Sequence, residues 1–194
     1  MLTRSCVLSA LLVVMLSPLA LACASRLGVD VAGVDNFGAV TAGAHGLYRG
    51  AQPSAEGIQT LRAMGVRTII NLRDDADPRE QAWAAAAGMQ YVRIPSSCHR
   101  PDAGDVQAFL TVMQGRPAPP LTTQPVAFPV FVHCRAGRDR TGLFVASYRI
   151  VEQHWSNQQA AQEMDGYGHI HIFCAQVDPF VEQLDPRAYD AGSD

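Results

Sequence analysis

Hydrophobic positions along the chain form short runs, and stretches with helical spacing separate most of these runs. Apolar runs at 67–72, 90–94 and 129–133 are typical of buried strands. Helical spacing is found at 54–64, 77–88, 105–114, 141–154, 156–164 and 178–184. This alternation predicts an α/β fold, with a central and mostly parallel sheet flanked by helices.

Local signals support the helix starts and one long loop. Ser54 precedes the first helix, and Asp77 precedes the second as an N-cap, with Pro78 at the first position and Glu80 at the third. Residues 115–129 contain five prolines and are predicted to form a surface loop before the strand that ends at His133.

The N-terminus has the pattern of an exported protein. Arg4 is followed by an apolar run over 6–16 and then by small residues, and this run is too short to span a membrane. The pattern predicts a secretory signal peptide over 1–24. The segment 19–23 also resembles a bacterial lipobox, in which Cys23 would carry the lipid. We therefore expect a periplasmic or secreted protein, with membrane contact only through a lipid anchor at Cys23.

Composition fits one small domain. The chain has 194 residues, of which 48% are hydrophobic, and this suffices for a single core. Its net charge of −3 argues against a nucleic-acid-binding surface. We expect a monomer.

The candidate chemistry is concentrated at 133–142, which reads His-Cys-Arg-Ala-Gly-Arg-Asp-Arg-Thr-Gly. Cys134 lies six positions before Arg140, in a loop between a buried strand and a helix that begins near Thr141. A cysteine attacks as its thiolate, and an unperturbed pKa of about 8.5 leaves most of it protonated at neutral pH. Converging loop amides and the positive end of the helix would stabilise the thiolate and bind phosphoryl oxygens.

Each residue type in this loop suits one task in phosphate chemistry. Arg140 can grip two phosphoryl oxygens in bidentate fashion, and Thr141 can donate its hydroxyl to the cysteine sulfur. His133 would fix the loop, and Gly137 lets it turn. Phosphate contacts are expected from Arg135, Ala136, Gly137, Arg138, Asp139 and Arg140. No second cysteine or histidine stands nearby at ligand spacing, so neither a metal nor a cofactor is expected.

The motif His-Cys-x-x-Gly-x-x-Arg-Thr-Gly resembles the signature of cysteine-dependent tyrosine and dual-specificity phosphatases. The segments 36–40, 47–53 and 65–73 are similar to the atypical group first described in plants and fungi, and 142–155 is similar to its bacterial periplasmic members. The resemblance covers about 34–165. It implies a phosphatase domain over 34–186, preceded by a linker at 25–33 and followed by a tail at 187–194.

The resemblance implies a general acid, normally an Asp on a mobile loop, that protonates the leaving group. Asp102 stands 32 positions before Cys134, a spacing similar to that of small dual-specificity phosphatases, and is the favoured candidate. An alignment to the periplasmic relatives anchored on Pro95 points instead to His99. Asp105 is a third candidate, although it also suits a helix cap. Asp139 is a fourth, because myotubularin-like phosphatases are proposed to use an Asp inside the loop.

Three substrate readings stay open at this point. The first is a protein phosphatase acting on phosphotyrosine, phosphoserine and phosphothreonine. The second is a phosphoinositide or inositol polyphosphate phosphatase, because basic residues at the positions of Arg135 and Arg138 hold extra phosphates in similar enzymes. The third is a pseudophosphatase that binds phosphoproteins without hydrolysis, which the presence of Cys134 and Arg140 disfavours. A rhodanese-type sulfurtransferase would not call for Arg140 and Thr141.

The remaining cysteines allow several pairings in an oxidising compartment. A Cys98–Cys174 disulfide would spare Cys134, whereas a Cys98–Cys134 disulfide would be a reversible off switch. Free buried thiols are an equal alternative.

Overall fold

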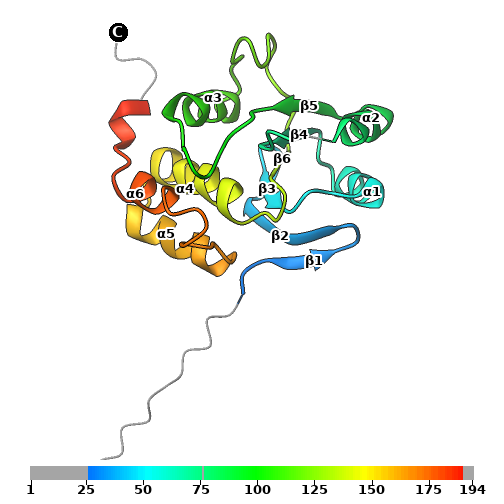
Figure 1. The fold of residues 1–194 in the computed structure, drawn as a ribbon. Coiled ribbons are helices and arrows are strands. Elements are labelled where there is room, and N and C mark those ends of the chain that lie inside the picture. Colours follow the sequence, from blue (N-terminus) through cyan, green and yellow to red (C-terminus); the bar gives the residue numbers. More distant parts are fainter. Residues whose placement is uncertain (1–25, 76, 190–194) are drawn as a thin grey trace, which may run out of the picture.

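The computed structural model describes residues 26–75 and 77–189, and its strands form one sheet of six in the order β1-β2-β3-β6-β4-β5 (Figure 1). The strands are β1 (Val29–Val31), β2 (Val34–Thr41), β3 (Leu47–Gly50), β4 (Thr68–Asn71), β5 (Gln90–Arg93) and β6 (Val130–His133). Strands β3, β6, β4 and β5 pair in parallel, while β1 and β2 pair antiparallel. The predicted α/β fold with a mostly parallel sheet is confirmed.

Helices cover both faces of the sheet, with α1 and α2 on one side and α3 to α6 on the other (Figure 1). The helices are α1 (Ala55–Ala63), α2 (Pro78–Ala86), α3 (Ala103–Met113), α4 (Asp139–Gln153), α5 (Asn157–Gly166) and α6 (Val177–Glu182), followed by a short 3₁₀ helix, Pro186–Tyr189. All four residues of β6 are buried, because this strand lies in the middle of the sheet between β3 and β4. The loop that starts at Cys134 therefore leaves the carboxyl end of a central parallel strand, where α/β sheets commonly bind ligands.

Two helices begin earlier than predicted, and capping explains the first of these shifts. Helix α3 begins at Ala103 because Asp102, and not Asp105, is its N-cap and accepts hydrogen bonds from the amides of Gly104 and Asp105. Helix α4 begins at Asp139, two residues before the predicted start at Thr141. The loop between β6 and α4 is therefore shorter than the sequence pattern implied.

The predicted linker and tail are wrong in part. Residues 25–33 contain β1, which pairs with β2, and the Leu27 amide donates to the Gly166 carbonyl. A three-residue strand is too short to show an alternating pattern, so β1 could not be predicted. At the other end, the 3₁₀ helix extends past residue 186 and buries Tyr189. The signal peptide predicted at 1–24, with Cys23, lies outside the described residues.

The described ranges, 26–75 and 77–189, contain no helix with the length and hydropathy needed to cross a membrane.

Candidate active site

The loop between β6 and α4 turns its carbonyl groups outward. The carbonyls of Arg135, Ala136 and Gly137 all accept hydrogen bonds from outside the loop. The Gln52 amide donates to the Arg135 carbonyl at 3.2 Å. The Asn36 side-chain amide donates to the carbonyls of Ala136 and Gly137, both at 3.2 Å. The Arg49 guanidinium donates to the Gly137 carbonyl at 2.9 Å. In a trans peptide the C=O and the following N–H point in opposite directions. The amides of residues 136–138 therefore point toward the inside of the loop, as the sequence predicted.

Gly137 is required by a close approach between this loop and β3. Its φ of +67° lies in the left-handed region, and a Cβ placed on it would lie 2.4 Å from the carbonyl carbon of Gly50. Any larger residue would push the loop away from the end of β3, so the loop path depends on glycine here.

Two buried residues behind the loop were not identified as site residues from the sequence. Asn36 adopts a positive φ of 52° and holds two loop carbonyls. Arg49 is fully buried, with its guanidinium 3.7 Å from the centre of the Tyr167 ring. Burial lowers the pKa of Arg49 to about 10, which still leaves it cationic at neutral pH. This places a positive charge behind the anion-binding loop, and the only sequence signal was that both residues lie in segments that carry the family resemblance.

The His133 side chain contacts the first residue of the loop, in the role predicted for it. The ring is fully buried, with Nδ1 3.0 Å from the carbonyl oxygen of Cys134 and Nε2 2.6 Å from Oε1 of Glu80. The other oxygen of the fully buried Glu80 accepts hydrogen bonds from Gln52 at 2.8 Å and from Asn71 at 3.3 Å. This network joins the ends of β3, β4 and β6 to α2, and it holds the first residue of the loop in place.

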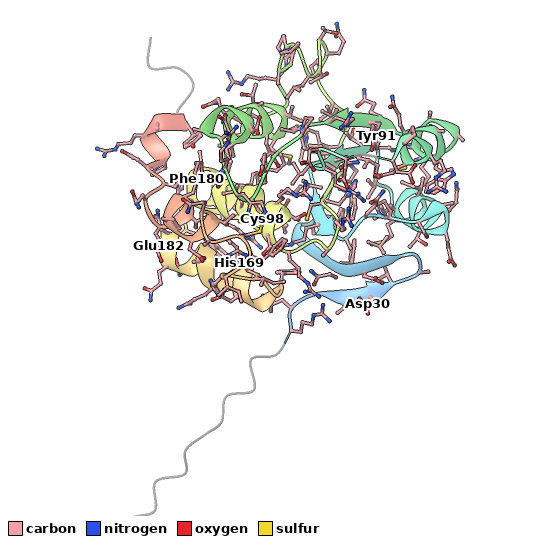
Figure 2. All side chains as sticks on the ribbon, viewed as in Figure 1. Asp30, Tyr91, Cys98, His169, Phe180 and Glu182 are labelled. Carbon is pink, nitrogen blue, oxygen red and sulfur yellow. A yellow bond between two sulfur atoms is a disulfide. The ribbon has the colours of Figure 1, made fainter. Side chains whose placement is uncertain are left out.

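Cys134 lies at the wall of a cavity of about 540 Å³ and is itself 4% exposed. Three chain segments form the other walls: 74–75 after β4, 97–99 after β5, and 170–174 between α5 and α6. A Cys98–Cys174 disulfide joins two of these segments; Cys98 is labelled in Figure 2. Of the pairings left open by the sequence, this is the one present, and it leaves Cys134 as the free cysteine of the described residues.

Two carboxylates after β4 face the arginines of the loop. Arg140 lies 2.9 Å from Asp74 and 3.2 Å from the carbonyl of Ser96, and its hydrogen bond lowers the pKa of Asp74. Arg135 donates at 2.7 Å to Asp75, whose pKa lies far below its usual range because Arg73 and then Arg135 hydrogen-bond to it. A phosphoryl group that binds Arg140 therefore competes with Asp74 for the same guanidinium.

The predicted bond from Thr141 to the cysteine sulfur is not formed. The Thr141 hydroxyl is fully buried and has no hydrogen-bond partner among residues 26–75 and 77–189. The exposed side chain of Arg135 reaches Asp75, and the Nε atom of Arg138 is buried with no hydrogen-bond partner in the same ranges. Both arginines line the cavity of Cys134, where a phosphate contact was predicted.

Asp139 is a structural anchor in this conformation. Its carboxylate lies 2.7 Å from Nδ1 of His169 and accepts a hydrogen bond from the Ile170 amide at 2.8 Å. Burial acts to raise the pKa of Asp139, but the hydrogen bonds from His169 and Ile170 outweigh it, and the pKa is lowered. A lowered pKa keeps the Asp139 carboxylate ionised, and an ionised carboxylate has no proton to deliver to a leaving group, which disfavours Asp139 as the acid.

Of the other candidates for the general acid, one lines the cavity of Cys134 and two line the groove beside it. His99 lines the cavity of Cys134, with its ring 5.4 Å from that of Phe173. Asp102 and Asp105 line an adjoining groove instead, and the Asp102 carboxylate is occupied as the N-cap of α3. Burial, and then the charge of Asp102, raise the pKa of Asp105. The structure does not bring Asp102 to Cys134, so a movement of the 95–102 segment has to precede its predicted role.

A cysteine and an arginine that close a loop of inward-facing amides, at the end of a central parallel strand, define an anion-binding site of the phosphatase type. Residues 33–172 match the family described as DSP-PTPase phosphatase fused to NAD+ kinase, and the chain therefore belongs to this phosphatase family. The resemblance inferred from the motif is confirmed.

Relatives with known names agree with this family. The chain is 36% identical over 124 residues to the dual specificity protein phosphatase TpbA of Pseudomonas aeruginosa, which covers 63% of this chain and 52% of TpbA. It thus spans about half the length of that relative. It is 37% identical over 144 residues to human phosphatidylglycerophosphatase and protein-tyrosine phosphatase 1, which covers 70% of this chain and 69% of the relative.

Solved structures show the same fold. The crystal structure of P. aeruginosa TpbA is 29% identical and has a TM-score of 0.63 over 87% of this chain and 95% of its own. The catalytic domain of the phosphatase SIW14 from S. cerevisiae has a TM-score of 0.63 over 80% of this chain and 89% of its own, at 20% identity, which supports the fold alone.

Proposed function

We propose that this protein is an exported phosphatase that hydrolyses phosphate monoesters on tyrosine, serine and threonine residues through a cysteinyl-phosphate intermediate. One observation carries the proposal: Cys134 and Arg140 bracket a loop whose carbonyls are held outward by Gln52, Asn36 and Arg49. Such preorganised donors favour the charge of a transferring phosphoryl group without reorganisation during the reaction.

The reaction divides into two displacements at phosphorus. In the first, the Cys134 thiolate attacks, the bond to the ester oxygen breaks, and the leaving oxygen takes a proton from the general acid. In the second, water attacks the cysteinyl phosphate and gives a proton to the general acid, which lost its own proton in the first step; the P–S bond breaks, and phosphate leaves with the thiolate restored. The loop amides and Arg140 bind the three non-bridging oxygens in both steps.

The substrate proposal draws on the relatives and on the walls of the cavity. TpbA is named a dual specificity protein phosphatase, and a solved structure of it holds phosphotyrosine. The exposed side chain of Phe173 at the cavity can pack against an aromatic ring of a substrate.

A second candidate function is hydrolysis of phosphoinositides or inositol polyphosphates. The Arg135 side chain is 70% exposed at the cavity, where it can contact a second phosphate. The human relative is named for phosphatidylglycerophosphate as well as for phosphotyrosine. A lipid or inositol phosphate is thus the nearest rival to a phosphoprotein.

One substrate panel distinguishes these functions. The purified protein is assayed on p-nitrophenyl phosphate, phosphotyrosine and phosphoserine peptides, a phosphoinositide and inositol hexakisphosphate. We expect the highest kcat/KM on the phosphotyrosine peptide. A preference for the inositol substrates would reverse the order of the two proposals, and binding of the peptides without turnover of any substrate would indicate a pseudophosphatase.

The general acid is tested by comparing Asp102→Asn with Asp105→Asn. Asparagine is as good an N-cap as aspartate, so Asp102→Asn should leave α3 intact and remove only the proton. We expect Asp102→Asn to slow peptide cleavage more than p-nitrophenyl phosphate cleavage, because p-nitrophenolate leaves without protonation. The Asp105→Asn variant tests the other carboxylate of the groove, and it should leave both rates unchanged if Asp102 is the acid. Unchanged rates for Asp102→Asn on both substrates would remove Asp102 as the acid.

Export is proposed on two grounds, the leader pattern at 1–24 and the Cys98–Cys174 disulfide, which is typical of oxidising compartments. We expect the full chain, produced in a Gram-negative host, to be found in the periplasm or medium with the leader removed. Intact mass spectrometry distinguishes cleavage after Ala22 with a free Cys23 from a lipidated Cys23. A cytoplasmic product that retains residues 1–22 would exclude export.

A further inference from the structure

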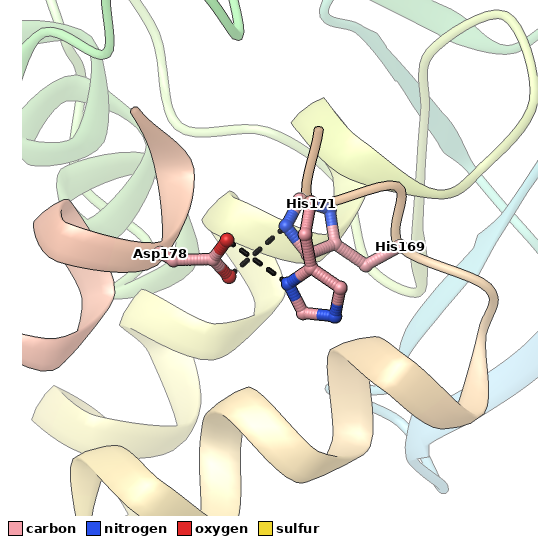
Figure 3. A group of neighbouring side chains, drawn as sticks. All are labelled: His169, His171 and Asp178. Carbon is pink, nitrogen blue, oxygen red and sulfur yellow. Dashed lines mark hydrogen bonds and ion pairs between the residues drawn. The ribbon is translucent and has the colours of Figure 1, made fainter. Parts of the chain in front are cut away.

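Three side chains that take no part in the proposed reaction lie close together, two in the segment between α5 and α6 and one in the first turn of α6. Figure 3 shows His169, His171 and Asp178 pointing toward one another, and one ligand atom of each lies within 4.8 Å of the others. Nε2 of His169 is 3.1 Å from Oδ1 of Asp178, and Nδ1 of His171 is 2.9 Å from Oδ2 of the same carboxylate. We infer that these three side chains bind one divalent transition metal ion, with Zn²⁺ as the best match.

The two histidines lie in a tight turn after α5. Gly168 has a φ of +82°, and the amides of Phe173 and Cys174 both donate to the Ile170 carbonyl, so the chain turns at His171. The Ile172 side chain faces solvent at 94% exposure, while His169 is buried and His171 is half exposed. Asp178 is in the first turn of α6, which packs against α4 and α5. Two segments separated by six residues therefore supply the three donors.

The second ring nitrogen of each histidine has a carboxylate partner. Nδ1 of His169 is 2.7 Å from Asp139, and Nε2 of His171 is 3.1 Å from Asp165. Histidines that ligate metals almost always donate their other N–H to a carboxylate or carbonyl, because this fixes the tautomer and orients the ring. Both rings here present one nitrogen to Asp178 and hold the other in this way.

The donor set selects the class of ion. Two imidazole nitrogens and one carboxylate suit Zn²⁺ and similar transition metals, whereas Mg²⁺ and Ca²⁺ prefer oxygen donors. Donors at about 2.1 Å from a tetrahedral ion lie about 3.4 Å apart. The distances from Asp178 to the two histidines, 3.1 Å and 2.9 Å, are close to this value, and all three ligand atoms lie within 4.8 Å of one another. The carboxylates of Asp139, Asp165 and Asp178 also supply negative charge, which a divalent cation offsets.

A bound ion would stabilise segment 170–174, which forms one wall of the cavity of Cys134. His169 is tied to Asp139 at the start of α4, and the segment that follows carries Phe173 and Cys174 into the cavity of Cys134. The bound ion would fix this segment to the phosphate-binding loop and to α6. Its role is structural, since His169, His171 and Asp178 do not line the cavity of Cys134.

The test is a metal titration of the full mature protein after removal of metal with a chelator. We expect one Zn²⁺ per chain by calorimetry and elemental analysis, a higher melting temperature with Zn²⁺, and no such effect of Mg²⁺. His171→Ala and Asp178→Asn should each lower the affinity at least about a hundredfold, and Asp165→Asn about tenfold. The matched control is His45→Ala, because His45 is exposed in a loop elsewhere.

Cys134 is the competing ligand, and Cys134→Ser separates the two sites. The Cys134→Ser variant should keep the Zn²⁺ site, and Co²⁺ bound to it should give the visible bands of nitrogen and oxygen donors without a thiolate charge-transfer band. The inference fails if the wild type binds no Zn²⁺ with a defined stoichiometry. It also fails if His171→Ala and Asp178→Asn, shown folded by circular dichroism, bind as tightly as the wild type, or if Cys134→Ser abolishes binding.

Discussion

Replacing Cys134 with serine should lower kcat on every substrate of the panel by at least about 10⁴-fold. A serine hydroxyl is far less acidic than a thiol, so the loop amides cannot generate an equivalent anion at neutral pH. Serine has nearly the same shape, and the network of His133 and Glu80 below the loop does not involve the sulfur. Single-turnover kinetics measures the loss of activity. Mass spectrometry of the acid-quenched wild-type enzyme should detect the phosphate on Cys134.

Phosphate binding is the control for this variant. The carbonyl contacts from Asn36, Arg49 and Gln52 remain, so Cys134→Ser should bind inorganic phosphate or vanadate within about tenfold of the wild type. Two results would contradict the proposed mechanism. The first is a trapped phosphate on a residue other than Cys134, and the second is a Cys134→Ser variant that keeps a tenth of the wild-type activity.

Replacing Arg140 with lysine should lower kcat/KM by about 10²- to 10³-fold, although the charge is kept. The planar guanidinium can hold two phosphoryl oxygens at once, whereas an ammonium group acts as a single point charge. Arg140 also donates to Asp74 and to the Ser96 carbonyl, and these contacts orient its guanidinium at the cavity. Steady-state kinetics on p-nitrophenyl phosphate measures the loss.

Arg187→Lys is the matched control for this substitution. Arg187 is exposed, is paired with Asp185 two positions before it in the chain, and does not line the cavity, so the kinetics of Arg187→Lys should equal those of the wild type. If Arg140→Lys kept kcat/KM within about threefold, bidentate binding of the phosphoryl group by Arg140 would be wrong.

Local sequence signals predicted most of the helices and the position of the loop. Ser54 and Asp77 cap the helices they were expected to start, and Ser156, the first residue of the helical range predicted at 156–164, caps α5. An N-cap can be predicted because it depends only on the few residues that follow it. The antiparallel strands β1 and β2 gave no such signal, since their pairing depends on partners elsewhere in the chain. The disulfide partner of Cys98 was also undetermined, because spacing along the chain does not fix distance in space.

Residues 133–142 alone were enough to predict the candidate reaction centre: a cysteine and an arginine six positions apart, with glycine between them, at the junction of a buried strand and a helix. These features are contiguous, and the conformation of a short loop follows from its own residues and flanking elements. Only the tertiary structure showed that Asn36 and Arg49 hold the loop carbonyls, that Asp74 faces Arg140, and that Asp139 anchors His169. Each of these contacts joins residues 30 or more positions apart, so it exists only once the sheet and helices have packed.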